Sequence, residues 1–334
     1  MKPIIAITIG DFNGVGPELA LKSASHPSVL KICTPLLVGP LSVFEHTAKQ
    51  YKIKLKFERA TLASIQTPSK DIIPIVDVAD GIGADVNYGG PTKASGRSAG
   101  VALERAVELC MQHKVAAMVT SPVSKEALNS AGYNFPGQTE MIALLTRSQS
   151  VAMMLVSDTM RVGLVTIHTG LKNVASQLSK EKIIEKIAII NESLKKDFRL
   201  KKPKLAILAL NPHCGENGLI GTEEKEMILP AIVDSQAAGI LAEGPFPADA
   251  FFGNHSYKNF DAFIAMYHDQ GLIPLKMSSF GKGVNFSAGL TIIRTSPDHG
   301  TAYDIAGKNK ANLSSMLEAI KLALTKSKNR QKND

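Results

Sequence analysis

Short apolar runs alternate with longer amphipathic runs along most of this chain, and this alternation restricts the fold more than any other feature. The apolar, β-branched runs predict strands at 4–9, 35–39, 116–121, 151–157, 161–168, 204–211, 262–268 and 290–296. The amphipathic runs predict helices at 98–113, 179–196 and 222–239, and a Gly-rich polar stretch predicts a surface loop at 78–97. This order is typical of α/β proteins, in which helices cover a largely parallel sheet.

Length and charge limit the classes of protein to consider. A chain of 334 residues is longer than one hydrophobic core usually serves, so we expect two domains. The net charge of +8 comes partly from basic runs at 194–204 and 326–334. We interpret these runs as solvated faces, and a basic field that attracts anionic substrates is the alternative. No nucleic-acid-binding motif accompanies them and tryptophan is absent, so no nucleic acid partner is expected.

Cysteine usage and hydropathy indicate the compartment. Cys33, Cys110 and Cys214 form no CxxC pair, which argues against a disulfide scaffold and fits a reducing compartment. The first apolar run is too short for a signal peptide, and no later run approaches the length of a membrane span. We therefore expect a cytoplasmic protein with no membrane partner.

The stretch GDFNGVGPE, residues 10–18, lies between the first predicted strand and a predicted helix. Gly14 and Gly16 form a G-x-G pair, but the third glycine of the dinucleotide-binding fingerprint is missing. No acidic residue ends a second strand about twenty positions later, as that fingerprint requires. Pro17 fits the first turn of a helix. The glycines are therefore predicted to shape a tight strand-to-helix turn.

Three histidines share one placement in the sequence. His168, His213 and His268 each close a predicted buried strand, and a glycine follows within three residues. Ligands of open α/β sheets collect beyond the carboxyl ends of the strands, where three imidazoles predict a divalent-metal site with positions open for substrate. Asp269 is a candidate to orient an imidazole. Satisfied core or turn residues are the alternative for the histidines, and a turn-forming role is the alternative for Asp269.

Cationic and amide side chains gather near the end of the chain. The stretch FGKGVNFSAGLTIIRTS contains Lys282, Asn285 and Arg294, and Lys276 precedes it. Lys and Arg with an amide donor suit a phosphate or carboxylate, Arg through its bidentate fork. The Pro-Gly turn in FPGQTE adds the neutral donors Gln138 and Thr139. These residues predict an anion site, although an exposed lysine is usually only solvated.

Six motifs together resemble one family of enzymes. They are GDFNGVGPE, TSPVSKEALNSAGYNFPGQTE, LNPHCGENGLIGTEE, GPFPADAFF, AMYHDQGLIPLK and FGKGVNFSAGLTIIRTSPDHGTAYDIAGK. They resemble the 4-hydroxythreonine-4-phosphate dehydrogenase family of pyridoxal phosphate biosynthesis, over residues 4–322. GVGPE and HGTAYDIAGK are also similar to stretches of isopropylmalate and isocitrate dehydrogenases.

The resemblance implies an α/β architecture of two α/β/α domains with a central cleft, like that of isopropylmalate dehydrogenase. The first domain is expected to comprise 1–130 and 275–334 on the cofactor side. The second is expected to comprise 131–274 on the metal and dimer side. The resemblance further implies a homodimer with the active site at its interface, where a metal ligand crosses from one subunit to the other.

The resemblance also assigns roles to residues of this chain. His168, His213 and His268 would hold one divalent metal, Zn, Co, Mn or Mg, with imidazole favouring Zn or Co over Mg. The substrate, a phosphorylated small molecule, would be bound by Gln138, Thr139, Lys276, Asn285 and Arg294. The cofactor, NAD with NADP as the alternative, would be bound at its adenosine end by Gly300, Thr301, Ala302, Asp304 and Ile305.

The implied reaction oxidises 4-phosphooxy-L-threonine at C3 and then releases carbon dioxide, which gives 3-amino-2-oxopropyl phosphate. The metal would lower the pKa of the C3 hydroxyl, and C3 would give hydride to the nicotinamide. The ketone would be β to the carboxylate, so carbon dioxide could leave while Lys276 stabilises enolate-like charge. Lys125 and Asp249 are candidates for the general base, and each could equally be a salt-bridge partner.

Three departures from the family pattern leave alternatives open. Gln138 stands where the family usually has His, and Gln donates a hydrogen bond but relays no proton. The usual GDPAGIGPE reads GDFNGVGPE here, and the proline that usually follows the His168 motif is missing. The first alternative is a dehydrogenase of 4-phospho-D-threonate or 4-phospho-D-erythronate on the same scaffold. The second is a non-catalytic metal- or anion-binding relative.

Overall fold

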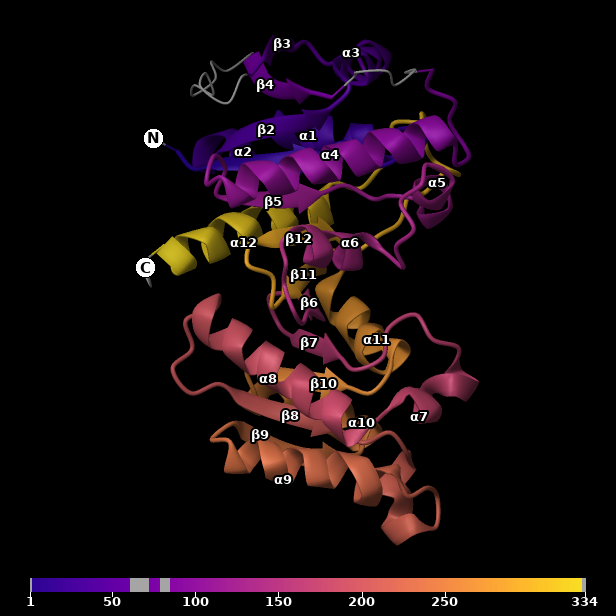
Figure 1. Cartoon of the computed structure of the whole chain (residues 1–334), viewed down its shortest axis with the longest axis vertical. Coiled ribbons are helices and arrows are strands. Elements are labelled where there is room, and N and C mark those ends of the chain that lie inside the picture. The colour runs from indigo at the N-terminus through magenta and orange to yellow at the C-terminus, as the bar shows by residue number, and fades with distance from the viewer. Residues whose placement is uncertain (1, 61–71, 79–84, 332–334) are drawn as a thin grey trace. The chain divides into compact units, whose positions relative to one another are not determined.

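The computed structural model of the chain describes residues 2–60, 72–78 and 85–331 (Figure 1). Contacts divide the chain into two compact units. Unit 1 comprises Met1–Ser148 and Leu290–Lys328, and unit 2 comprises Gln149–Gly289 and Asn329–Asp334. The sequence predicts domain boundaries at 130/131 and 274/275, whereas the two compact units divide at 148/149 and 289/290. Gln138, Thr139 and Arg294 consequently belong to one unit.

Unit 1 is built on strands that pair in parallel, in the order β3-β4-β2-β1-β5-β12. Their bounds are β1 (Ile4–Thr8), β2 (Thr34–Gly39), β3 (Lys56–Arg59), β4 (Ile72–Asp77), β5 (Ala117–Thr120) and β12 (Arg294–Pro297). β1, β2 and β5 are buried along nearly their whole length, as expected of parallel strands covered on both faces.

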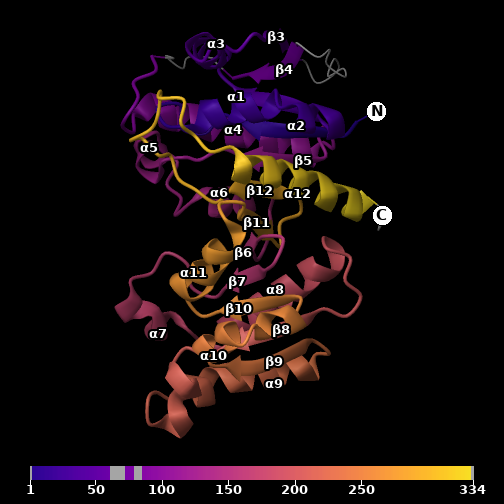
Figure 2. The same cartoon turned by 180° about the vertical axis from the view of Figure 1, so that it is seen from behind.

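The helices of unit 1 flank this sheet. They are α1 (Gly16–Ala24), α2 (Pro27–Ile32), α3 (Leu41–Gln50), α4 (Lys93–Met111), α5 (Lys125–Ser130), α6 (Gln138–Leu145) and α12 (Ser314–Gln331). α4 lies across β1, β2 and β5 (Figure 1). The hydroxyl of Thr295 in β12 donates to the carbonyl of Ala319 in α12 at 2.9 Å, which fixes α12 on the sheet (Figure 2).

The predicted loop at 78–97 is wrong at its end, because α4 begins at Lys93 and not at residue 98. Thr92 caps the helix: its hydroxyl accepts from the amide of Ser95 at 3.1 Å. The hydroxyl of Ser95 in turn accepts from the amide of Thr92 at 3.2 Å. This reciprocal capping box starts a helix in spite of Gly96. Residues 79–84 of the predicted loop lie outside the described residues.

Unit 2 contains a mixed sheet in the order β11-β6-β7-β10-β8-β9. β11–β6 and β6–β7 are antiparallel, and β7–β10, β10–β8 and β8–β9 are parallel. The strands are β6 (Ala152–Val156), β7 (Arg161–Leu164), β8 (Lys204–Leu208), β9 (Leu241–Phe246), β10 (Ala262–Ala265) and β11 (Val284–Ala288). The carboxyl ends of the parallel strands β7, β10 and β8 therefore meet at one edge.

The helices of unit 2 cover both faces of its sheet, and alternation along β7 shows which lies where. A Cβ on Gly163 would meet Ile190 of α8, whereas Val162 and Leu164 face Gly271 of α11. The helical segments are η1 (Leu171–Asn173), α7 (Val174–Gln177), α8 (Lys180–Lys196), η2 (Pro212–Gly218), η3 (Glu224–Ile228), α9 (Leu229–Ala237), α10 (Ala248–Gly253), η4 (Ser256–Asn259) and α11 (His268–Ser279). Figures 1 and 2 show α8 and α11 beside the strands.

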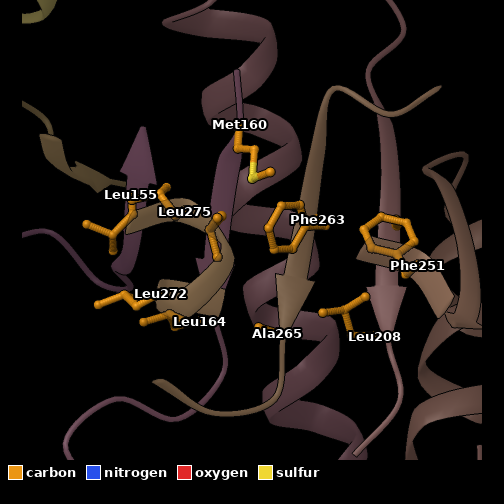
Figure 3. Close-up of a cluster of buried hydrophobic side chains, with 11 residues drawn as sticks. Leu155, Met160, Leu164, Leu208, Phe251, Phe263, Ala265, Leu272 and Leu275 are labelled. Carbon is orange, nitrogen blue, oxygen red and sulfur yellow. The ribbon is translucent and has the colours of Figure 1, made fainter. Parts of the chain in front are cut away.

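A cluster of buried apolar side chains holds α11 and α10 against the strands of unit 2 (Figure 3). Phe263 of β10 packs against Phe251 of α10, with ring centroids 5.7 Å apart. Leu272 and Leu275 bring α11 into the same cluster. Truncation of a buried phenylalanine such as Phe263 to alanine typically costs about 3–5 kcal/mol. The cluster therefore fixes the segments from which the predicted metal ligands extend.

The predicted α/β class is confirmed. Seven of the predicted strands correspond to strands of the structure, but the run at 290–296 forms a strand only from Arg294 onward. β3, β4, β9 and β11 were not predicted. The predicted helix at 222–239 is a π-helical turn followed by α9. None of the helices within residues 2–60, 72–78 and 85–331 combines the length and the apolar composition needed to cross a membrane.

Candidate functional site

The glycines of residues 10–16 form the tight turn from β1 into α1 that the sequence predicts. The amide of Asp11 donates to the carbonyl of Pro122 at 2.8 Å, and a Cβ on Gly10 would lie 2.4 Å from that oxygen. A Cβ on Gly14 would lie 2.6 Å from the carbonyl oxygen of Thr301. The amide of Val15 donates to that same oxygen at 2.9 Å. The absence of side chains thus permits close approach of two other backbone segments.

The carboxylate of Asp11 is the polar centre of this turn. It is fully buried and accepts hydrogen bonds from the amide of Asn13 at 2.9 Å, the hydroxyl of Ser95 at 3.0 Å and the hydroxyl of Tyr303 at 2.8 Å. Burial raises the pKa of Asp11, and these hydrogen bonds oppose the rise. The predicted cofactor residues Gly300, Thr301, Ala302, Asp304 and Ile305 therefore lie on a loop that contacts the glycine turn at Thr301 and Tyr303.

Arg294 forms the centre of the predicted anion site in unit 1. Its side chain is buried, and Nε and Nη2 donate to the hydroxyl of Thr120 at 3.1 and 2.8 Å. Nη2 also donates to Oε1 of Gln138 at 3.3 Å, and Nη1 to the hydroxyl of Thr139 at 3.5 Å. Burial lowers the pKa of Arg294 to about 10, with the charge of Glu140 opposing, so the guanidinium stays protonated at neutral pH. Three predicted substrate residues are thus brought together.

The segment around Gly137 adds another predicted residue to this site. α6 begins with Gln138 and Thr139, so their side chains occupy the first helical turn. A Cβ on Gly137 would lie 3.9 Å from Cε of Lys125 and 2.9 Å from the carboxylate of Glu140. Lys125, an exposed residue that begins α5, therefore lies beside the anion site. Its role as a base stays a prediction.

Two of the three predicted metal ligands lie together in unit 2. The amides of Val165 and Thr166 donate to the carbonyls of Ala265 and Met266, which continues the pairing of β7 and β10 past the strand ends. This pairing brings the rings of His168 and His268 to a centroid separation of 5.9 Å, with 39° between their planes. The two imidazoles thus extend from neighbouring strand ends, as the sequence predicts.

The residues next to His268 determine its orientation. Nδ1 of His268 lies 2.6 Å from Oδ1 of Asp269, whose carboxylate is the predicted orienting group. Gln270 is buried: its Oε1 accepts from the amide of Met266 at 2.7 Å and its Nε2 donates to the carbonyl of Ala209 at 2.6 Å. Gln270 therefore ties the end of β10 to the end of β8. A pairing of imidazole with carboxylate is the usual outer arrangement around metal-bound histidine.

His213 occupies an unusual backbone conformation. The residues from His213 to Asn217 all have positive φ, between 44° and 75°, so the chain makes a left-handed helical turn after β8. Left-handed conformations cost about 1–2 kcal/mol for each residue other than glycine. Strained backbone that persists is concentrated at functional sites. His213 is exposed on this turn.

Glu224 holds the start of the left-handed turn. Its buried Oε1 accepts from the amides of Leu210 and Asn211 at 2.8 and 2.7 Å, and its Oε2 accepts from Nδ2 of Asn211 at 3.0 Å. Glu223 accepts from the same Nδ2 at 2.7 Å. The sequence predicts a helix at 222–239, and the structure adds that Glu224 binds the backbone that leads into the left-handed turn.

The remaining predicted residues of unit 2 are dispersed over several elements. Lys276 and Lys282 are exposed, on α11 and after it, and Asp249 is exposed on α10. The half-buried Asn285 lies on β11, and its Oδ1 is buried without a hydrogen-bond partner among residues 2–60, 72–78 and 85–331. An unpartnered buried amide oxygen is costly, so it indicates a group that a ligand would satisfy.

A complete metal site is not assembled by the described part of the chain. Within it, no group of three or more His, Cys, Asp or Glu side chains could hold a metal ion. His168 and His268 fit two positions of such a site by their chemistry and proximity. The three-histidine set stays a prediction.

Comparison with known proteins identifies the family. The family model described as "Pyridoxal phosphate biosynthetic protein PdxA" matches residues 31–323. This chain belongs to that family. A PdxA-family protein of Trichlorobacter lovleyi, named 4-hydroxythreonine-4-phosphate dehydrogenase, is 42% identical over 96% of this chain and 97% of its own length.

Two further PdxA-type relatives bear on function and fold. A protein of Oceanobacillus iheyensis, named as a D-threonate 4-phosphate dehydrogenase, is 40% identical over 97% of this chain and 96% of its own length. The crystal structure of 4-hydroxythreonine-4-phosphate dehydrogenase from Klebsiella pneumoniae superposes with a TM-score of 0.87, at 33% identity and over 98% of each chain. The resemblance inferred from the six motifs is therefore confirmed.

Sequence reasoning missed three residues that organise the PdxA-family site. Asp11 and Asn13 lie in the glycine turn, and the sequence prediction assigned a role to its glycines but not to these two buried polar side chains. Glu224 lies within the predicted helix at 222–239, where its hydrogen bonds to the preceding backbone were not predicted. A signal was available for Asp11 and Asn13, because a short polar pair inside an apolar strand-to-helix turn needs hydrogen-bond partners when buried. The left-handed turn at His213 had no comparable signal.

Proposed function

We propose that this chain is a metal- and NAD-dependent 4-hydroxythreonine-4-phosphate dehydrogenase. It would convert 4-phosphooxy-L-threonine and NAD⁺ to 3-amino-2-oxopropyl phosphate, carbon dioxide and NADH, in pyridoxal phosphate biosynthesis. The observation that carries the proposal is the buried guanidinium of Arg294, aligned by Thr120 and adjoining Gln138 and Thr139. Relatives of that name, similar over nearly the whole chain, give the specific activity.

The anionic groups of the substrate would be bound by cationic, hydroxyl and amide side chains. Arg294 offers a charged fork whose orientation is set by the hydroxyl of Thr120. The hydroxyl of Thr139 and the amide of Gln138 adjoin it as neutral donors. Lys276 and Asn285 would bind the substrate too, and a hydroxyl or ammonium group of the substrate would donate to the buried Oδ1 of Asn285. Fixing a remote phosphate in this way orients the reacting carbon.

His168, His213 and His268 would hold a divalent metal ion, with zinc or cobalt favoured by imidazole ligands. A bound ion would supply Lewis-acid polarisation of the substrate hydroxyl and, later, of the ketone. Asp269 would keep Nδ1 of His268 protonated and leave Nε2 as the coordinating atom. As the family resemblance implies, a second copy of the chain would supply one of the ligands in a homodimer.

Exposed apolar side chains support the homodimer. Those of unit 2 include Leu219 on the left-handed turn and Ile273, Met277 and Phe280 along and after α11, exposed by 57–85%. Large exposed apolar side chains mark interaction surfaces when they gather on neighbouring elements. They lie in the same segments as His213 and His268, so association through them would complete a metal site.

NAD would bind at its adenosine end beside the loop of Gly300, Thr301, Ala302, Asp304 and Ile305. The glycine turn of residues 10–16 packs against this loop at Thr301, so the two would form adjoining walls. No dinucleotide fingerprint is required for this arrangement. NADP is the alternative cofactor.

Two proton movements accompany the proposed oxidation and decarboxylation. The C3 hydroxyl loses its proton as C3 transfers a hydride to NAD⁺. C2 gains a proton after its bond to the departing carbon dioxide breaks. Lys125 and Asp249 are the candidate bases for the first transfer. The ammonium of Lys276 would stabilise the enolate-like charge that forms as carbon dioxide leaves.

A second candidate is dehydrogenation of 4-phospho-D-threonate or 4-phospho-D-erythronate on the same scaffold. Gln138 favours it, because this amide contacts Arg294 at a position where the family usually has histidine. The relative named as a D-threonate 4-phosphate dehydrogenase is as similar to this chain as several of the others.

The three phosphorylated acids can be compared in one assay. The purified protein is stripped of metal, reloaded with Zn²⁺, Co²⁺, Mn²⁺ or Mg²⁺, and mixed with NAD and each acid while NADH absorbance is followed. NADH from 4-phosphooxy-L-threonine supports the first function, and NADH only from the threonate or erythronate supports the second. No NADH from any acid rejects both. His213→Ala should abolish metal-dependent turnover, whereas His255→Ala, a change on the short η4 segment, should not.

A further inference from the structure

Asn13 joins the glycine turn to residues 87–92, a segment that follows β4 in the chain. Its side chain is fully buried. Nδ2 donates to the hydroxyl of Thr92 at 3.1 Å, and Oδ1 accepts from the amide of Asn87 at 2.8 Å. Its backbone carbonyl accepts from the amide of Gly89 at 3.2 Å. Three hydrogen bonds from one residue therefore fix the segment 87–92.

The same segment also contacts the far end of the loop predicted to bind the cofactor. A Cβ on Gly307 would lie 2.7 Å from the ring of Tyr88, so the ring packs directly on that glycine. Gln50 links the two, because its Oε1 accepts from the hydroxyl of Tyr88 and its Nε2 donates to the carbonyl of Gly307 at 3.0 Å. Segment 87–92 thus adjoins both the glycine turn and the loop 299–307.

Asn13, which holds segment 87–92, differs in exposure from the residues of that segment that a ligand could contact. Asn13 is buried, whereas Asn87 and Gly89 are exposed. In the neighbouring loop, Nε2 of His299 is buried without a hydrogen-bond partner among the described residues, immediately before Gly300. A polar atom left in that state indicates that the site is completed by another molecule.

We infer that Asn13 is a positioning residue that holds segment 87–92 as a third wall of the adenosine subsite, beside the glycine turn and the loop 299–307. The inference rests on the proposed function, because it assigns an adenine nucleotide to that loop. Asn13 touches neither cofactor nor substrate in this account. Its side chain fixes the backbone amide of Asn87 and the hydroxyl of Thr92. The exposed face of segment 87–92 would then contact the nucleotide.

Asn13→Ala tests the inference, because it removes both side-chain hydrogen bonds and keeps the backbone bond to Gly89. The probes are NAD and ADP-ribose, with binding measured by calorimetry on the full-length, metal-loaded protein. We expect the Kd of both to rise about tenfold, the loss typical of two buried hydrogen bonds that order a binding segment. Amide hydrogen exchange at Asn87 should accelerate, and the KM for the phosphorylated acid should change less than about twofold.

Ser235→Ala is the matched control, since it removes one buried hydrogen bond, from the hydroxyl to the carbonyl of Ala231, in unit 2. It should leave nucleotide binding unchanged. If the alanine variant does not fold, Asn13→Ser replaces it. This variant retains one short hydroxyl and should give a smaller rise in Kd.

The possible results separate this inference from the proposed function. Wild-type affinity for NAD and ADP-ribose in Asn13→Ala and Asn13→Ser would overturn the inference alone. An equal loss in Ser235→Ala would overturn it as well, because the effect would then be general destabilisation. Binding of neither probe to the wild-type protein would overturn the assignment of a nucleotide to this loop, and the proposed function with it.

Discussion

The guanidinium of Arg294 and the hydroxyl of Thr120 are joined by two hydrogen bonds, from Nε at 3.1 Å and from Nη2 at 2.8 Å. One small hydroxyl thus fixes the plane of a buried cation. An ammonium group cannot keep both contacts and the fork, so Arg294→Lys should weaken substrate binding. We expect the KM for the phosphorylated acid to rise about 30-fold, or about 2 kcal/mol, with the KM for NAD unchanged.

Steady-state kinetics measures both constants, and Arg105→Lys on the exposed part of α4 serves as the control. An unchanged KM for the acid in Arg294→Lys would show that the guanidinium does not bind substrate.

The contact between the glycine turn and Thr301 can be tested separately. Gly14→Ala places a Cβ 2.6 Å from the carbonyl oxygen of Thr301, so the turn and the loop must separate. We expect the Kd for NAD to rise at least about tenfold, because two walls of the proposed subsite move apart. Gly253→Ala adds a Cβ that meets nothing within 4 Å and should bind NAD as the wild type does. Normal NAD affinity in Gly14→Ala would place the nucleotide elsewhere.

Glu224 should stabilise the left-handed turn that carries His213. Glu224→Gln keeps one acceptor oxygen for the amides of Leu210 and Asn211 but turns an amide donor toward Nδ2 of Asn211. Loss of charge-assisted hydrogen bonds should cost about 2 kcal/mol, which corresponds to a fall in Tm of about 4–8 °C. Calorimetric Tm values measure this effect.

Glu223→Gln is the matched control for that measurement, because Glu223 accepts a hydrogen bond from the side chain of Asn211 and leaves the amides of Leu210 and Asn211 to Glu224. It should lower the Tm much less. Equal shifts in the two variants would mean that Glu224 has no special part in holding the turn. A titration with Co²⁺, followed by its visible absorption, should show weaker binding in Glu224→Gln than in Glu223→Gln.

Cys214 lies on the same left-handed turn, and the pH dependence of its alkylation rate tests the charges around it. Burial raises its pKa above the ordinary value of 9.0, and the negative charges of Glu224 and Asp249 raise it further. Only the thiolate reacts, so alkylation by iodoacetamide should be slow at neutral pH and should still be accelerating between about pH 7 and pH 9. A rate that levels off below pH 9 would contradict this. Asp249→Asn should speed alkylation, because it removes one of the charges that disfavour the thiolate.

Cys33 and Cys110 provide an internal comparison. Both are buried, and burial raises the pKa of each to about 12. Mass spectrometry of the alkylated protein should therefore find modification at Cys214 before either of them.

Much of the fold follows from periodicity in the sequence, and the exceptions have physical causes. Strands such as β1 and β10 are almost wholly apolar runs, because both of their faces are buried. β3 is mostly exposed and β9 is only partly buried, so neither gives such a run. The start of α4 was missed because its capping box uses Thr92 and Ser95 ahead of a glycine.

The candidate site could be predicted in its residue types but not in its assembly. The side chains of Gln138, Thr139 and Arg294 meet, because Gln138 and Thr139 begin α6 and Arg294 begins β12. The backbone conformation of His213 was not predictable, because consecutive non-glycine residues of positive φ run against local preference. The roles of Asp11 and Asn13 depend on partners more than seventy residues away.

The central claim is oxidative decarboxylation of a phosphorylated hydroxy acid, and the release of the substrate carboxyl group tests it most directly. 4-Phosphooxy-L-threonine labelled at the carboxyl carbon is incubated with NAD and the metal-loaded protein, and labelled carbon dioxide and NADH are measured together. We predict equimolar release of the two products, and neither product after removal of the metal with a chelator. NADH without labelled carbon dioxide, or neither product with metal present, would contradict the account.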